Sequence, residues 1–119
     1  MKNKTFLDSI KCAFNGFFFA VKTEKNFKYY FVIALIFLAA NLFCKISFAG
    51  HLAYFITVSG VFSSECINTS VEHFVDMQDT SIRPEIKLIK DMAAATVLCW
   101  GFGFFSCEIY SIGGALCLF

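Results

Sequence analysis

A nearly unbroken apolar run, YYFVIALIFLAANLFC at residues 29–44, is the feature that most constrains the fold of this chain. A helix that is apolar on every side needs surroundings without water around its whole circumference. A chain of 119 residues has too little interior to provide them, and 58% of its residues are hydrophobic. We therefore predict a single-domain all-α membrane protein over residues 1–119, and exclude a disordered tail, a coiled coil and an ordinary soluble enzyme.

Three apolar segments, at about 29–48, 52–75 and 92–112, predict three membrane spans. Ahead of them, residues 2–22 repeat apolar residues at intervals of three and four and carry lysines, which predicts an amphipathic helix lying on the membrane surface. We expect a turn at residues 45–51 and a polar connection at residues 77–90. We also expect Gly101 and Gly103 to permit close helix packing.

The basic residues predict the orientation of the chain. Six lysines precede the first span, three basic residues lie in the second connection, and Lys45 alone lies on the other side. Because basic residues favour the cytoplasmic side, the N-terminus and residues 77–91 are expected in the cytoplasm and the C-terminus outside. A net charge of +1 gives no indication of a nucleic-acid partner.

The second predicted span carries a stripe of polar residues in its second half: Glu65, Asn68, Glu72 and Asp76. At ~100° per residue, their spacing of three, seven and eleven places them on one narrow face of a helix. Counted from Leu52, Glu65 would lie just beneath the cytoplasmic headgroups, with Glu72 and Asp76 emerging into water. A polar seam that joins helices, or a proton path, is the alternative reading of the same spacing.

The stripe has the layout needed to join a lipid hydroxyl to a water-soluble phosphate donor. A carboxylate at the depth of the hydroxyl can take its proton. Carboxylates at the water boundary can hold Mg²⁺, which prefers oxygen ligands and substrate phosphates. The following connection supplies the cations that phosphoryl transfer requires, namely Arg83, Lys87 and Lys90. A helix-end ion pair of Glu72 with Lys87 or Lys90 is the plainer alternative.

Three motifs resemble those of the small bacterial diacylglycerol kinase and undecaprenol kinase family. They are ECINTSVEHFVD at residues 65–76, KDMAAATVL at 90–98 and TEKNFK at 23–28. The resemblance implies a homotrimer in the bacterial inner membrane, with a surface helix and three spans per subunit, that phosphorylates a membrane lipid alcohol with ATP and Mg²⁺. Like that family, the chain has no phosphate-binding G-x-x-x-x-G-K-[ST] loop.

The resemblance also implies roles for individual residues. Glu65 would be the general base, with Asn68 positioning the substrate beside it, and Glu24 and Glu72 would be the Mg²⁺ ligands. The residues implied to lie at the nucleotide are Glu24, Glu72, Asp76, Ser81, Ile82, Arg83, Lys90 and Asp91.

The Asn68–Thr69 pair and the Glu24-x-Asn26-Phe27 motif resemble the undecaprenol kinase branch of the family more closely. Undecaprenol is therefore the favoured substrate, diacylglycerol is the alternative, and a small oligomeric channel without enzymatic activity is a third interpretation. Three polar residues are expected to have no part in the chemistry. Glu108 should be solvated at the outer end of its span, His51 should lie on the outer surface, and Asn41 should form an interhelical hydrogen bond.

Overall fold

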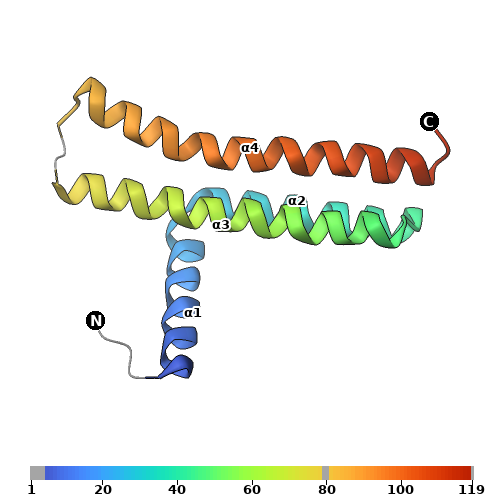
Figure 1. The fold of residues 1–119 in the computed structure, drawn as a ribbon, viewed down its shortest axis with the longest axis horizontal. Helices are drawn as coiled ribbons and strands as arrows, with labels where there is room; N and C mark the ends of the chain where they lie inside the picture. Colours follow the sequence, from blue (N-terminus) through green and yellow to red (C-terminus); the bar gives the residue numbers. More distant parts are fainter. Residues whose placement is uncertain (1–4, 79–80, 119) are drawn as a thin grey trace.

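The computed structural model describes residues 5–78 and 81–118, and the helices in these ranges are α1 (Phe6–Thr23), α2 (Lys25–Cys44), α3 (Phe48–Gln78) and α4 (Pro84–Ala115). Helices α2, α3 and α4 run side by side along the long axis, and α1 runs across them (Figure 1). No strand occurs in the described ranges, so the all-α prediction is confirmed. Residues 2–4 of the predicted surface helix lie outside them.

Helix α1 is amphipathic and meets α2 at a sharp elbow. It begins at Thr5, whose hydroxyl oxygen accepts a hydrogen bond from the Asp8 N–H at 3.2 Å. It ends where Glu24 becomes extended, and the Glu24 N–H donates to the Ala20 carbonyl oxygen at 2.9 Å. Large apolar side chains such as Phe14 and Phe18 remain exposed along α1. An apolar face without a protein partner is what a helix lying on a membrane surface presents.

A cluster of three aromatic rings fixes the elbow against α3. Phe27, in the first turn of α2, is fully buried, and its ring stacks on Phe62 of α3 with centroids 5.7 Å apart. Phe17 of α1 meets both rings edge-on, at 5.8 and 6.4 Å. We call these three residues the elbow cluster. Because one ring comes from each helix, the cluster joins α1, α2 and α3.

The helix boundaries correct several predicted ones. Helix α2 begins at Lys25 instead of residue 29, and it ends at Cys44 because Lys45 adopts a left-handed conformation (φ 53°, ψ 52°). Helix α3 already begins at Phe48, so the predicted turn at 45–51 was too long. Helix α4 begins at Pro84, a residue suited to a first helical turn, and therefore includes the second half of the predicted polar connection. These segments were misassigned because exposed polar residues can be helical without an apolar pattern.

Two of the three predicted spans, α2 and α4, are long and apolar enough to cross a membrane. Helix α3, at 31 residues, has the length but does not reach that hydropathy in the described part of the chain. The reason is its polar stripe, which replaces apolar residues in the second half of the helix.

Close packing between α3 and α4 depends on Gly60, and the prediction for Gly101 and Gly103 was wrong for contacts within one chain. A Cβ atom added to Gly60 would lie 2.1 Å from Cε3 of Trp100 in α4. A Cβ atom added to Gly101 or Gly103 would meet nothing within 4 Å. The closest approach is therefore at a glycine on the opposite helix from the predicted ones, and Gly50 of α3, where an added Cβ atom would lie 2.9 Å from Oγ of Ser111, is a second such position.

The outer end of the bundle corrects the expectations for Glu108 and Asn41. Glu108 of α4 is 1% exposed instead of solvated, and it interacts electrostatically with His51 and Tyr54 of α3. Asn41 of α2 is also fully buried and faces Glu108. The Asn41 amide faces the Glu108 carboxylate across two helices, so the expected interhelical contact of Asn41 is present, but its atoms have no hydrogen-bond partner in the described chain.

Candidate active site

The polar stripe on α3 runs from the buried middle of the molecule to its exposed end. Glu65 is 2% exposed and Asn68 is 6% exposed, whereas Glu72 is half-buried and Asp76 is exposed. All four lie on one continuous helix, as their spacing predicted. Among the carboxylates of the stripe, that of Glu65 is therefore the most protected from solvent, and that of Asp76 is the most accessible to it.

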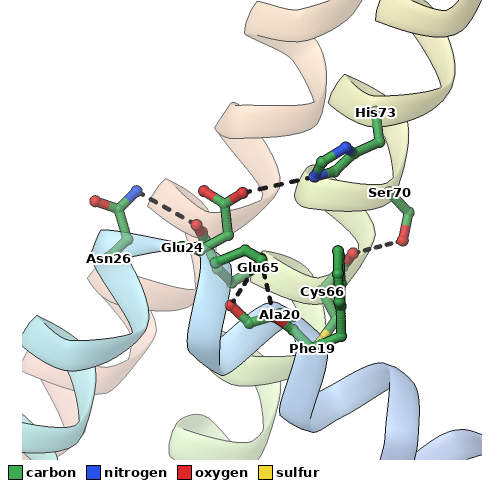
Figure 2. Close-up of polar contacts among 9 residues, drawn as sticks. Phe19, Ala20, Glu24, Asn26, Glu65, Cys66, Ser70 and His73 are labelled. Atoms are coloured by element: carbon green, nitrogen blue, oxygen red, sulfur yellow. Dashed lines mark hydrogen bonds and ion pairs between the residues drawn. The ribbon is translucent and has the colours of Figure 1, made fainter.

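The elbow between α1 and α2 brings two polar side chains to this stripe, as Figure 2 shows. Asn26 Nδ2 donates a hydrogen bond to Glu65 Oε1 at 3.3 Å. Glu24 Oε1 lies 3.8 Å from Nε2 of His73, whose side chain is largely exposed. Both contacts require the chain to turn at Glu24, since a straight continuation of α1 would carry Glu24 and Asn26 away from α3.

The two predicted metal ligands gather near the predicted base. The carboxylates of Glu24 and Glu72 both lie close enough to Glu65 to interact electrostatically with it. Carboxylate oxygens are the ligands that Mg²⁺ prefers, so the donor chemistry fits this ion. The described residues contain no group of three or more His, Cys, Asp or Glu side chains that could hold a metal by themselves. Two carboxylates here would therefore need phosphate oxygens and water to complete an octahedral shell.

Predicted nucleotide residues meet where α3 and α4 extend beyond the elbow. Lys90 Nζ of α4 lies 2.5 Å from Oδ1 of Asp76, which brings two of these residues together. Lys87 Nζ lies 2.6 Å from Oδ2 of Asp91, one turn along the same helix. The recorded ion pairs of both lysines thus go to aspartates, contrary to the alternative in which one pairs with Glu72.

The remaining predicted nucleotide residues lie in the connection before α4. Ser81 and Ile82 precede Arg83, which occupies the extended N-cap position of that helix without a side-chain capping hydrogen bond. The side chain of Ile82 is 99% exposed.

A cavity of about 510 Å³ lies beside Glu65, between α2, α3 and α4. Asn26, Tyr30, Glu65 and Asn68 supply the polar groups of its lining. The rest of the lining is apolar, as in most small-molecule sites, and includes Ala34, Val58, Val97, Phe102 and Phe105. Two buried atoms near Glu65, Asn68 Oδ1 and Thr69 Oγ1, have no hydrogen-bond partner within the described chain. A buried acceptor without a partner at the polar end of an apolar cavity suits a ligand with a hydroxyl head and an apolar tail.

Two residues of this site, Asn26 and Tyr30, were not predicted from the sequence as parts of it. They are four residues apart, so they lie on the same face of α2 and both line the cavity. The signal was present in the TEKNFK motif, but Asn26 could be assigned to Glu65 only once the elbow was known.

Comparisons with known proteins agree with this chemistry. The family described as prokaryotic diacylglycerol kinase matches residues 11–111. The chain is 32% identical over 104 residues to an undecaprenol kinase of Bacillus subtilis (strain 168). The aligned region covers 87% of this chain and 83% of that protein. No solved structure matches the chain significantly.

Proposed function

Because the chain belongs to the prokaryotic diacylglycerol kinase family and is therefore a lipid kinase, we propose that its substrate is undecaprenol, which it converts to undecaprenyl phosphate with ATP and Mg²⁺. The observation that carries the proposal is the position of Glu65, a buried carboxylate at the polar end of an apolar cavity. The similarity to an undecaprenol kinase favours this lipid. The family description favours diacylglycerol as the alternative substrate.

The cavity supports a lipid alcohol as the acceptor. Its apolar lining would take the portion of the tail next to the head, and the hydroxyl would lie between Glu65 and Asn68. Asn68 lines the cavity beside Glu65, so its amide N–H can donate to the hydroxyl oxygen and orient the hydroxyl while the hydroxyl proton points to Glu65. We assign substrate positioning to Asn68 on this basis.

Glu65 acts as the general base in the proposed reaction. Its carboxylate receives the proton of the lipid hydroxyl as the lipid oxygen bonds to the γ-phosphorus of ATP. The bond from that phosphorus to the oxygen bridging the β- and γ-phosphates breaks, and ADP leaves. A positioned base of this kind typically contributes ~10²–10⁴-fold to the rate.

Residues at the mouth of the site hold the donor. Glu24 and Glu72 would bind Mg²⁺ together with the ATP phosphates, and the ion would neutralise the charge that develops on those phosphates. Lys90 would leave its pairing with Asp76 to contact the phosphates, while Asp76 and Asp91 remain near the nucleotide. Ser81, Ile82 and Arg83 complete the proposed nucleotide site from the connection before α4.

The helix lengths support three spans with the site at the inner boundary of the membrane. Helix α2 has 20 residues, or ~30 Å at ~1.5 Å per residue, which is about the thickness of the hydrocarbon layer. Asn26, in the first turn of α2, contacts Glu65, and this supports a position of Glu65 at the level where α2 would enter the membrane. Residues of α3 beyond Glu65 then extend into the cytoplasm with the start of α4. This placement agrees with the orientation inferred from the basic residues, in the inner membrane of a bacterium.

We further propose that the active form is a homotrimer. Exposed apolar side chains on α2 and α4, such as Leu35, Leu98 and Phe102, offer surface to lipid or to a second subunit. The buried polar groups without a partner in one chain, such as Thr69 Oγ1, give a second reason to expect neighbouring subunits.

The test is a lipid panel. Purified protein in detergent is incubated with labelled ATP, Mg²⁺ and either undecaprenol, diacylglycerol or a long-chain alkane that has no hydroxyl group. We expect label in undecaprenyl phosphate, and we expect Glu65→Gln to abolish it without loss of folded protein. Preferential labelling of diacylglycerol would establish the alternative substrate. Near-normal turnover by Glu65→Gln at saturating Mg²⁺ and ATP would remove the general-base assignment.

A further inference from the structure

The hydrogen bond from Asn26 to Glu65 joins two residues 39 positions apart in the sequence. Asn26 lies in the first turn of α2, immediately after the elbow, and its amide nitrogen reaches one of the two Glu65 carboxylate oxygens (Figure 2). The Glu65 side chain is buried, and Asn26 is the hydrogen-bond donor recorded for it among the described residues. A buried carboxylate that has lost most of its hydration depends strongly on each remaining donor.

The packing next to Asn26 fixes where its side chain can reach. The following residue, Phe27, is fully buried in the elbow cluster and stacks on Phe62. Phe62 precedes Glu65 by three residues, so the two lie on neighbouring turns of one face of α3. The ring contact therefore holds the first turn of α2 against the part of α3 that carries Glu65, and this keeps the Asn26 amide within reach of the carboxylate.

We propose that Asn26 is a positioning residue for phosphoryl transfer, which holds the Glu65 carboxylate charged and in one orientation. Donation to Oε1 restricts rotation of the carboxylate and leaves Oε2 as the oxygen that accepts the proton of the lipid hydroxyl. An amide donor also stabilises the ionised form of a carboxylic acid over the neutral form, and the ionised form is the one that acts as a base. Other titratable groups that face Glu65 are the carboxylates of Glu24 at the elbow and Glu72 on α3, which act against ionisation, and the Tyr30 hydroxyl on α2. The inference rests on the proposed role of Glu65 as the general base.

The test compares substitutions at Asn26 in the lipid phosphorylation assay. Asn26→Leu keeps the approximate volume and removes the donor. We expect kcat to fall about 10- to 100-fold, since a hydrogen bond to a charged group is lost, while KM for ATP and for the lipid stays within about twofold. The acidic limb of the pH–kcat profile should move to higher pH. Asn26→Gln, which retains an amide donor, should recover part of kcat and the original limb.

Two further variants give the test its controls. Asn26→Asp puts a second carboxylate beside Glu65, and repulsion between like charges should move the acidic limb further than Asn26→Leu does. Tyr29→Leu alters an exposed side chain on the same turn and should leave kcat and the pH profile unchanged. If Asn26→Leu does not fold, the acidic limbs of the pH–kcat profiles of Asn26→Gln and Asn26→Asp are compared instead. An identical limb in both variants would contradict the proposed role of Asn26.

The outcomes separate this inference from the proposed function. Suppose that the protein phosphorylates lipid and that Glu65→Gln abolishes this activity. If the Asn26 variants then keep the original kcat and pH profile, the role of Asn26 is wrong and the proposed function stands. Retained turnover in Glu65→Gln instead overturns the role of the base on which the inference rests.

Discussion

Replacing Gly60 with alanine should disrupt the packing of α3 against α4. The new Cβ atom would lie 2.1 Å from Cε3 and 2.3 Å from Cδ2 of the Trp100 indole. Carbon atoms in favourable contact are about 3.5–4.0 Å apart, so the two helices must separate or the indole must turn by roughly 1.5 Å. The atoms in conflict belong to a rigid ring, so the strain cannot be relieved at the end of a flexible chain. Overpacking of this kind typically costs about 1–3 kcal/mol.

The assay is the free energy of unfolding in mixed micelles, obtained by titrating a denaturing detergent and following the signal of Trp100. Gly60→Ala should lose about 1–3 kcal/mol relative to the original chain. Gly103→Ala is the matched control, because a Cβ atom there meets nothing within 4 Å of the chain. It should be neutral or slightly stabilising, since alanine is the better helix former by about 1 kcal/mol.

A double-mutant cycle identifies the cause. Trp100→Leu removes the ring that the new methyl group strikes, so Gly60→Ala should cost much less in that background, and unfolding there is followed by circular dichroism. The coupling between the two positions should exceed about 1 kcal/mol, whereas sites without a shared contact usually add within about 0.5 kcal/mol. Equal stability of Gly60→Ala and Gly103→Ala would refute the close approach of α3 and α4 at Trp100.

Three other predictions concern the metal, the assembly and the outer end of the bundle. Glu24→Gln and Glu72→Gln should each raise the concentrations of Mg²⁺ and ATP needed for half-maximal activity. Both should lower turnover and largely keep lipid binding. An unchanged Mg²⁺ titration in both variants would remove the proposed metal role. Mixing inactive Glu65→Gln and Lys90→Met subunits should restore part of the activity if each site is built between chains, and no recovery in subunits shown to exchange would indicate a site within one chain. Asn41→Leu should lower the free energy of unfolding by about 1–3 kcal/mol, because it replaces the amide dipole that faces the buried Glu108 carboxylate with an apolar group. The double substitution Asn41→Leu with Glu108→Leu should recover much of that loss, and a wild-type value for Asn41→Leu alone would contradict the prediction.

The sequence by itself was sufficient for the helices and for the gradient along the stripe. Residues within one helix have a fixed angular relationship, so the spacing of Glu65, Asn68, Glu72 and Asp76 determined that they share a face. The apolar runs indicated α2 and α4 as helices fit to cross a membrane. The family and the lipid kinase activity could be predicted because three motifs, each local in sequence, carry them.

Helix ends were predicted less well, because an apolar pattern reports where a helix is buried and not where it starts. The first two turns of α4 alternate charged residues with apolar ones and were therefore assigned to a connection. The early start of α2 was missed for the same reason, since Lys25 and Lys28 interrupt the apolar pattern.

Contacts between helices were decided by the tertiary structure alone. Nothing in the spacing of residues predicted that Asn26 would bond to Glu65, that Lys90 would pair with Asp76, or that Gly60 would be the glycine of close approach. Glu108 was expected at a solvated end of its helix, yet α2 and α3 present Asn41, His51 and Tyr54 to it. Periodicity relates the residues of one helix to each other. The rotation of that helix about its own axis decides which neighbour each face contacts, and this rotation is set by packing against the other helices.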